Sequence, residues 1–119
     1  MALNILIVDD SEIVRAVIKK TFGIAGIETG QIFEAGNGKE GLGVLQEAWV
    51  DLVLADINMP IMNGLEMIEH MTQDEVLKKI PIVVISTEGS LTRIEELRAK
   101  GVRAYVRKPF TPEQIKKTV

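Results

Sequence analysis

The sequence of 119 residues contains no cysteine, few aromatic residues and no run of basic residues. Without cysteine the chain has no disulfide, thiolate metal site or thiol nucleophile, which fits a reducing compartment. A net charge of −3 without a basic tract argues against direct binding to nucleic acid. The longest unbroken apolar runs, such as Ile5–Val8, have four residues and are too short for a membrane span or a signal peptide. We therefore expect a cytoplasmic protein.

The residues that are present predict one globular domain. Hydrophobic residues make up 46% of the chain and charged residues 26%, which is typical of folded rather than disordered proteins. The length suits a single domain over residues 1–119, and no repeat or linker divides it.

Five segments rich in apolar and β-branched residues predict strands: Leu3–Val8, Gln31–Ala35, Leu52–Ala55, Ile82–Ser86 and Val102–Arg107. The first is too continuous for a half-exposed strand and predicts a central position in a sheet. The last alternates apolar and polar residues, which favours an edge position.

Apolar residues at helical spacing predict a helix after each strand. Ser11 and Asn37 are the expected N-caps of the first two helices, the third begins near Asn63, and Thr111 with Gln114 predicts a capping box for the last. The segment Thr72–Lys79 is expected to be a loop or a frayed turn. The side chains predicted to face the core are Ile13, Val14, Val17, Ile18 and Phe22, then Leu42, Leu45 and Trp49, then Leu65, Ile68 and Met71, then Leu91, Ile94 and Leu97, and finally Ile115 and Val119.

Strict alternation of strand and helix predicts an α/β fold with a parallel sheet and helices on both faces. Five strands are too few for a closed α/β barrel. We therefore expect a doubly wound five-stranded parallel sheet.

Polar residues stand where four of these strands end. Asp9 and Asp10 follow the first strand, Asp56 follows the third, Ser86 ends the fourth and Lys108 follows the fifth. Because parallel strands deliver their carboxyl ends to one edge, where ligands bind in such sheets, these groups would meet at one site.

Three carboxylates in one pocket repel each other unless a cation neutralises them. An all-oxygen donor set without histidine or cysteine favours a hard ion, Mg²⁺ or Mn²⁺. A lysine and a hydroxyl nearby suit a phosphoryl group, and Asp56, standing singly before a shaped loop, is the expected nucleophile of phosphoryl transfer to a carboxylate.

Each residue also has a structural interpretation. Asp9 and Asp10 would serve as helix-capping residues, Asp56 as a turn residue, Ser86 as a strand-end hydroxyl and Lys108 as a surface charge. These interpretations give no reason for all of them to share one sheet edge, so their joint placement favours a functional site.

The motifs VDD at Val8–Asp10, ADINMPIMNG around Asp56, Ser86 after a β-branched strand and KPF at Lys108–Phe110 resemble the receiver domain of bacterial two-component response regulators. The similarity is greatest to single-domain chemotaxis regulators of the CheY type, and it covers essentially the whole chain. It implies a flavodoxin-like sheet of order 2-1-3-4-5.

The resemblance implies a role for each matching acid. Asp56 would accept a phosphoryl group from a histidine of a sensor histidine kinase. Asp10, Asp56 and the backbone carbonyl of Asn58 would bind Mg²⁺ directly, and Asp9 would act through a metal-bound water.

The resemblance further implies a switch. Lys108 and Ser86 would contact phosphoryl oxygens, and Tyr105 would turn inward as Ser86 moves. This movement would change the surface of the helix around Leu91–Leu97, the strand Val102–Arg107 and the helix Thr111–Val119, which would bind a downstream protein target. Pro109 corresponds to the family's cis-proline.

Three positions bear on the lifetime of the phosphoryl group. Asn58 and Glu88 would flank the path of the hydrolytic water, as in CheY-like regulators, and predict a short lifetime. Thr87 stands where the family usually has alanine or glycine, and its larger side chain would narrow access to Asp56. A phosphatase is a possible further partner.

Several alternatives remain. The chain is either a complete regulator or the receiver of a longer one with an effector domain, for example a DNA-binding domain. A Mg²⁺-dependent aspartyl-phosphate phosphohydrolase is disfavoured because Asn58 stands where such enzymes carry a second acid, so no external substrate is expected. Flavin binding is disfavoured because the loop after the first strand lacks a Ser/Thr/Gly-rich phosphate cradle. We expect His70 to be exposed and Trp49 to contribute to packing.

Overall fold

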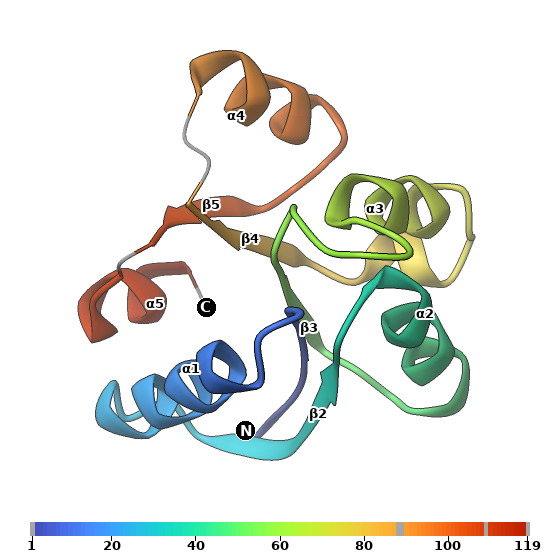
Figure 1. The fold of residues 1–119 in the computed structure, drawn as a ribbon. Coiled ribbons are helices and arrows are strands. Elements are labelled where there is room, and N and C mark those ends of the chain that lie inside the picture. Colours follow the sequence, from blue (N-terminus) through green and yellow to red (C-terminus); the bar gives the residue numbers. More distant parts are fainter. Residues whose placement is uncertain (1, 88–89, 109, 119) are drawn as a thin grey trace.

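The structure, a computed structural model, describes residues 2–87, 90–108 and 110–118. These form a five-stranded sheet with helices on both faces (Figure 1). The strands are β1 (Leu3–Val8), β2 (Thr29–Ala35), β3 (Leu52–Ala55), β4 (Ile82–Ser86) and β5 (Ala104–Arg107), and every neighbouring pair is parallel. The order β2-β1-β3-β4-β5 confirms the predicted doubly wound sheet.

Two helical layers cover the sheet. The helices are α1 (Glu12–Ile24), α2 (Gly38–Glu47), α3 (Gly64–Thr72), α4 (Leu91–Ala99) and α5 (Pro112–Thr118), with a short 3₁₀ helix η1 (Leu77–Lys79) before β4. Helices α1 and α5 pack on one face, and α2, α3 and α4 lie on the other (Figure 1). No helix in the described part of the chain is long and apolar enough to cross a membrane.

The three central strands are buried on both faces, as their continuous apolar runs predict. Residues Ile5–Val8 of β1 are at most 1% exposed, and every residue of β3 and β4 is buried. This burial gives the polar residues that follow these strands a rigid support.

The predicted helix caps are present. The side chains of Ser11 and Asn37 each accept a hydrogen bond from the backbone N–H three residues later. Thr111 and Gln114 form the reciprocal capping box at the start of α5. Local side-chain chemistry thus sets where these helices begin.

Some boundaries differ from the predictions. Strand β2 begins at Thr29, two residues early, and Val102 is buried but precedes β5. The segment Thr72–Lys79, expected to be a loop or a frayed turn, contains the ordered turn η1, because Leu77 is buried in the core. Helix α1 ends before Gly26, whose φ of +73° favours glycine.

Four side chains predicted to face the core are instead exposed. Ile13, Val17, Trp49 and Leu91 are between 50% and 77% exposed. The first two lie on the outer side of α1, which buries a narrower stripe than its apolar residues suggest. Trp49 lies beyond the end of α2, and Leu91 is the first residue of α4. The inward position predicted for Val119 lies outside the described residues.

Candidate functional site

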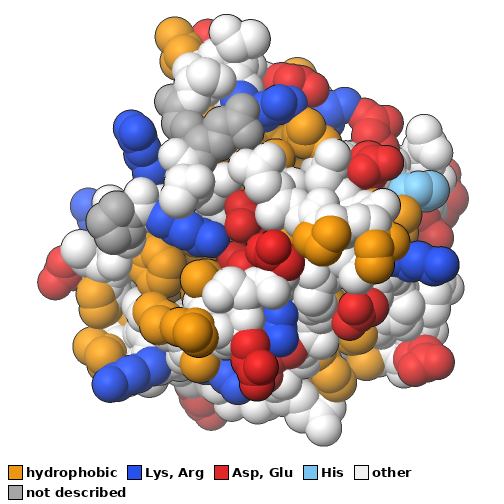
Figure 2. Space-filling model, in the orientation of Figure 1, with side chains coloured by type: hydrophobic (Ala, Val, Ile, Leu, Met, Phe, Trp, Pro, Cys, Tyr) orange, Lys and Arg blue, Asp and Glu red, His pale blue; other side chains and the backbone are white. Residues whose placement is uncertain are grey.

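The carboxyl edge of the sheet gathers the acidic residues. Asp9 directly follows β1 and Asp56 directly follows β3, and Val8 and Ala55 are register partners in the β1–β3 pair. Carboxylate oxygens of Asp9, Asp10 and Asp56 lie within 4.8 Å of one another. Acidic side chains are visible at the centre of this face of the molecule, with a basic group beside them (Figure 2).

Lys108, which directly follows the edge strand β5, contacts this cluster. Its Nζ lies 2.9 Å from Asp9 Oδ2 and 3.3 Å from Asp56 Oδ2, and its backbone N–H donates to the Ser86 carbonyl at 2.9 Å. Burial opposes the charge of the ammonium, but the hydrogen bond that it donates to Asp9 and the charge of Asp56 outweigh this effect and raise the pKa of Lys108. The ammonium is therefore a built-in counter-charge.

The three carboxylates differ in how fully their oxygens are used. Asp9 is buried, and its Oδ1 accepts from the Ser11 backbone N–H at 2.9 Å. Asp56 Oδ1 accepts from the Ile57 backbone N–H at 2.7 Å. Asp10 is exposed, and the described contacts include no hydrogen bond to its carboxylate. Asp9 and Asp56 each also accept from the Lys108 ammonium on Oδ2, so Asp10 keeps more lone pairs for a ligand than either of them does.

Two glycines hold the loop after Asp56 in place. The Gly64 N–H donates to the Ile57 carbonyl at 2.8 Å, and a Cβ on Gly64 would lie 2.1 Å from the Asp56 carbonyl oxygen. The Gly38 N–H donates to the Met62 carbonyl at 2.8 Å, and a Cβ there would lie 2.9 Å from the same oxygen. The loop thus fits directly against the amino ends of α2 and α3.

A strained turn lies within this loop. The Met62 N–H donates to the Pro60 carbonyl at 2.7 Å, so that only Ile61 separates the bonded residues. Ile61 has a φ of +67°, which is rare for a β-branched residue, and it is 78% exposed. Nothing in its packing offsets this strain, so the tight loop itself imposes the conformation.

Arg15 is a site-supporting residue that sequence reasoning missed. Its Nη1 donates to the Asp9 carbonyl, and its Nε donates to Glu34 Oε1 at 3.0 Å. Lys19 also binds Glu34, at 2.8 Å, and this hydrogen bond is the main reason that the pKa of Glu34 is lowered. Arg15 therefore ties the acidic turn to β2. Arg15 stands four residues after the N-cap Ser11, and residues at this spacing are neighbours on a helix, so the sequence could have placed Arg15 near the acidic turn.

The other predicted site residues are spread around the cluster. Ser86 is fully buried at the end of β4, and Thr87 after it is exposed. Asn58 is exposed in the loop after Asp56. Tyr105 is half-buried against the core, with its hydroxyl oxygen buried. Glu88 and Pro109 lie outside the described residues.

The donor set fits a hard divalent cation. Three carboxylates and one ammonium give a formal charge of −3 + 1 = −2, which one Mg²⁺ would neutralise. Among the described residues the cluster offers carboxylate oxygens as ligands, and oxygen is what Mg²⁺ selects. The carboxylates of Asp9, Asp10 and Asp56 are the groups placed to hold such an ion.

Comparisons with known proteins bear on the family and the fold of the chain. Residues 5–119 match the family model described as response regulator receiver domain. The chain is 37% identical over 115 residues to chemotaxis protein CheY1 of Helicobacter pylori, covering 96% of this chain and 91% of that protein. It is 35% identical over 114 residues to CheY-3 of Vibrio cholerae, covering 96% and 86%. The structure of V. cholerae chemotaxis protein CheY4 superposes with a TM-score of 0.86 at 34% identity, covering 99% and 96%.

Proposed function

The chain belongs to the response regulator receiver domain family, and on this basis we propose that it is a two-component signalling switch phosphorylated on Asp56 by a sensor histidine kinase. The observation that carries the proposal is the cluster itself. Asp56 lies at the carboxyl edge of the sheet beside two further carboxylates and a lysine that contacts it. This is the set of groups that phosphoryl transfer to a carboxylate requires.

In the proposed transfer, an Asp56 carboxylate oxygen attacks the phosphorus of a phosphohistidine. The new O–P bond forms as the P–N bond breaks, and the electron pair leaves with the imidazole. Mg²⁺ held by Asp10, Asp56 and the Asn58 carbonyl, with Asp9 acting through water, would neutralise phosphoryl charge. Lys108 already contacts Asp56 Oδ2 and would contact a phosphoryl oxygen in its place.

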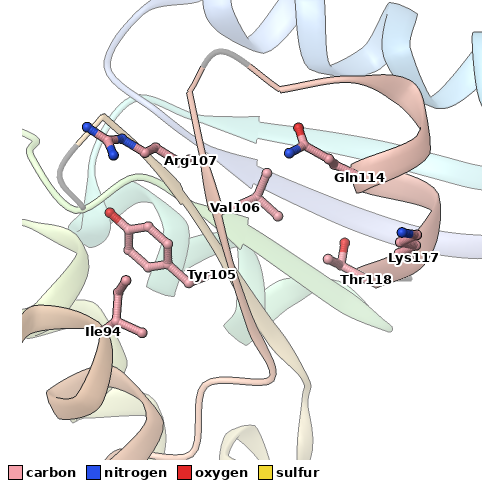
Figure 3. Close-up of a pocket in the computed structure, with 7 residues that line it drawn as sticks. All are labelled: Ile94, Tyr105, Val106, Arg107, Gln114, Lys117 and Thr118. Carbon is pink, nitrogen blue, oxygen red and sulfur yellow. The ribbon is translucent and has the colours of Figure 1, made fainter. Parts of the chain in front are cut away.

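The signal would leave through the far strands of the sheet. Ser86 pairs in register with Arg107, and Val84 pairs with Tyr105. A shift at the end of β4 would therefore displace the paired residues of β5. A pocket of about 440 Å³ lies here between α4 and α5. Figure 3 shows the Tyr105 ring next to Ile94 of α4, while the side chains from α5 line the other side.

We propose that Ser86 moves towards the phosphoryl group and that Tyr105 follows, reshaping this α4–β5–α5 surface for a downstream protein. The curated relatives named above are chemotaxis proteins, so a partner in chemotaxis is the first to test. A decisive change of state requires on the order of a few kcal/mol of differential stabilisation, which a phosphoryl group bound by a cation, a lysine and a hydroxyl supplies.

The same proposal limits the chemistry to self-phosphorylation and self-dephosphorylation. The residue two positions after Asp56 is the amide Asn58, which cannot serve as the general acid that a phosphohydrolase needs. We propose that Asn58 and Glu88 set a short phosphoryl lifetime, against which Thr87 acts by narrowing access. A phosphatase would be a further partner.

Intact mass after incubation with acetyl phosphate tests the proposal. Wild type should gain a single phosphoryl group in the presence of Mg²⁺ and none after chelation, and Asp56→Asn should gain none. Asp51→Asn is the matched control, because Asp51 lies at the other end of β3, and it should be labelled as wild type is. Labelling of Asp56→Asn, or failure of wild type to be labelled by both acetyl phosphate and a phosphorylated kinase, would contradict it.

A further inference from the structure

Arg15 contacts the backbone of the acidic turn between β1 and α1. Its side chain extends from α1 and is 16% exposed, and Nη1 donates to the carbonyl oxygen of Asp9. The next residue, Asp10, carries the carboxylate that keeps the most lone pairs for a ligand, because Asp9 and Asp56 accept from backbone N–H groups and from Lys108. A contact to the peptide group between Asp9 and Asp10 therefore bears on where this carboxylate points.

The backbone on both sides of Asp10 is held by hydrogen bonds. The Asp9 carbonyl belongs to the peptide group before the Asp10 Cα, and it accepts from Arg15. The Ser11 N–H belongs to the peptide group after this Cα, and it donates to Asp9 Oδ1 at 2.9 Å. Because peptide groups are planar, a hydrogen bond to one atom orients the whole group, and the two groups together set the direction of the Asp10 Cα–Cβ bond.

Arg15 is in turn anchored to the sheet. Its Nε donates to Glu34 Oε1 at 3.0 Å, and Glu34 is the register partner of Ile7 in the parallel pair of β1 and β2. Lys19 Nζ donates to the other carboxylate oxygen of Glu34 at 2.8 Å. The planar guanidinium thus binds β2 with one nitrogen and the turn with another, which the single nitrogen of a lysine is not shaped to do. The Asp9 carbonyl is tied to the sheet through these two hydrogen bonds.

Two other roles account less well for these contacts. A neutralising charge would contact a carboxylate of the cluster, and that place is taken by the Lys108 ammonium, 2.9 Å from Asp9 Oδ2. A structural ion pair between α1 and β2 is already supplied by Lys19 and Glu34, and it needs no donor to the turn. The hydrogen bond to the Asp9 carbonyl is what distinguishes Arg15 from Lys19.

We propose that Arg15 is a positioning residue for the divalent cation: it holds the Asp9–Asp10 peptide group so that the Asp10 carboxylate faces the other two acids. The role rests on the proposed function, in which Asp10 is a direct ligand of Mg²⁺. In the arrangement that Arg15 holds, carboxylate oxygens of the three acids lie within 4.8 Å of one another. Without Arg15 the peptide group gains rotational freedom, and binding of the ion must then order it.

Calorimetric titration with MgCl₂ tests this inference on Arg15→Met and Lys19→Met. Methionine keeps an unbranched side chain but removes the donors and the charge. Arg15→Met should bind Mg²⁺ about tenfold more weakly than wild type, as is typical when a residue that orients a metal ligand is lost. Lys19→Met is the matched control, because it removes the same charge from the same helix and a contact to the same Glu34 but none to the turn. It should bind Mg²⁺ no more weakly than wild type does.

The direction of the change separates positioning from charge and from folding. Removal of a positive charge beside the cluster would by itself strengthen the binding of a cation. A loss of stability alone would leave the dissociation constant of the folded protein unchanged, and circular dichroism shows whether each titrated variant is folded. Arg15→Lys keeps the charge without the guanidinium, so its affinity for Mg²⁺ should lie between those of Arg15→Met and wild type.

Labelling by acetyl phosphate gives a second readout. The Mg²⁺ concentration for half-maximal labelling of Arg15→Met should rise about tenfold, and excess Mg²⁺ should restore labelling. Unchanged or tighter Mg²⁺ binding by Arg15→Met would overturn the inference, as would equal weakening in Lys19→Met or a wild type that binds no Mg²⁺. Failure of the proposed function looks different: a wild type that binds Mg²⁺ but is never labelled contradicts phosphorylation, while weaker Mg²⁺ binding by Arg15→Met still supports the positioning role.

Discussion

Replacing Asp10 by asparagine should stabilise the protein in the absence of Mg²⁺. The carboxylate oxygens of the cluster lie within 4.8 Å of one another, where two like charges repel by about 0.9 kcal/mol in a water-like dielectric. Asp10 is exposed, so the value for a water-like dielectric applies to it. Its carboxylate is repelled by Asp9 and Asp56 and attracted by Lys108, which leaves a net repulsion of about one such pair. Relief of this repulsion should raise the free energy of unfolding by about 1 kcal/mol.

The same substitution should remove the response to Mg²⁺. An ion that binds only the native state at ten times its dissociation constant adds about 1.4 kcal/mol to stability, and Asp10→Asn removes a proposed ligand. The two stabilities should therefore converge or cross as Mg²⁺ is added. This pattern separates relief of charge repulsion from an unrelated gain in packing.

Urea unfolding with and without Mg²⁺ measures both effects. Far-UV circular dichroism is the appropriate signal, because the only tryptophan, Trp49, is already exposed in the native state. At ordinary m-values the variant's midpoint should rise by about 0.5 M without Mg²⁺. Glu95→Gln, which removes an exposed carboxylate of α4, is the control and should change neither quantity. A variant less stable than wild type without Mg²⁺, or equally stabilised by it, would refute the reasoning.

Three further predictions concern the surroundings of the site. Gly64→Ala should lower the free energy of unfolding by about 3 kcal/mol, because the new Cβ would overlap the Asp56 carbonyl oxygen. Gly43→Ala, which has open space around the new Cβ, should raise the free energy of unfolding by about 1 kcal/mol. Thermal unfolding of the two variants measures both effects. Ile61→Gly should stabilise by about 1 kcal/mol by relieving a positive φ at an exposed position, and a lower urea midpoint would contradict the assigned strain. The raised pKa of Lys108 means that its stabilising contribution is complete below its unfolded pKa, near 10.5, and is lost as pH rises through the raised value. Wild type should accordingly lose stability above about pH 10.5 more steeply than Lys108→Met, as measured by urea unfolding across that range.

The sheet and its functional edge could be predicted because they depend on simple patterns. Continuous apolar runs such as Ile5–Val8 and Ile82–Ile85 indicate strands buried on both faces, and a polar residue after such a run must lie at the sheet edge. Caps are equally local, since Ser11 needs only the N–H groups that follow it. The strand order came from the family resemblance and not from the pattern.

What could not be predicted depends on tertiary packing. Ile13 and Trp49 have the spacing of core residues but are exposed, because spacing does not tell how wide a stripe a helix buries or where the helix ends. Arg15 was missed because its two partners, the Asp9 carbonyl and Glu34, come together only when β2 pairs with β1. The burial of Leu77 depends on distant elements, so the local pattern of Thr72–Lys79 does not predict it.

The glycine contacts of the loop after Asp56 have a consequence for the direction of signalling. Backbone hydrogen bonds at Gly38 and Gly64 fasten this loop to α2 and α3, and α3 buries four of its residues. Helix α4, in contrast, buries only Leu97 fully. A structural change at Asp56 is therefore resisted by the tightly packed helices α2 and α3. Helix α4 is less buried, so its displacement costs less free energy. The molecule is mechanically asymmetric, and α2 and α3 act as the fixed frame against which the opposite half is displaced.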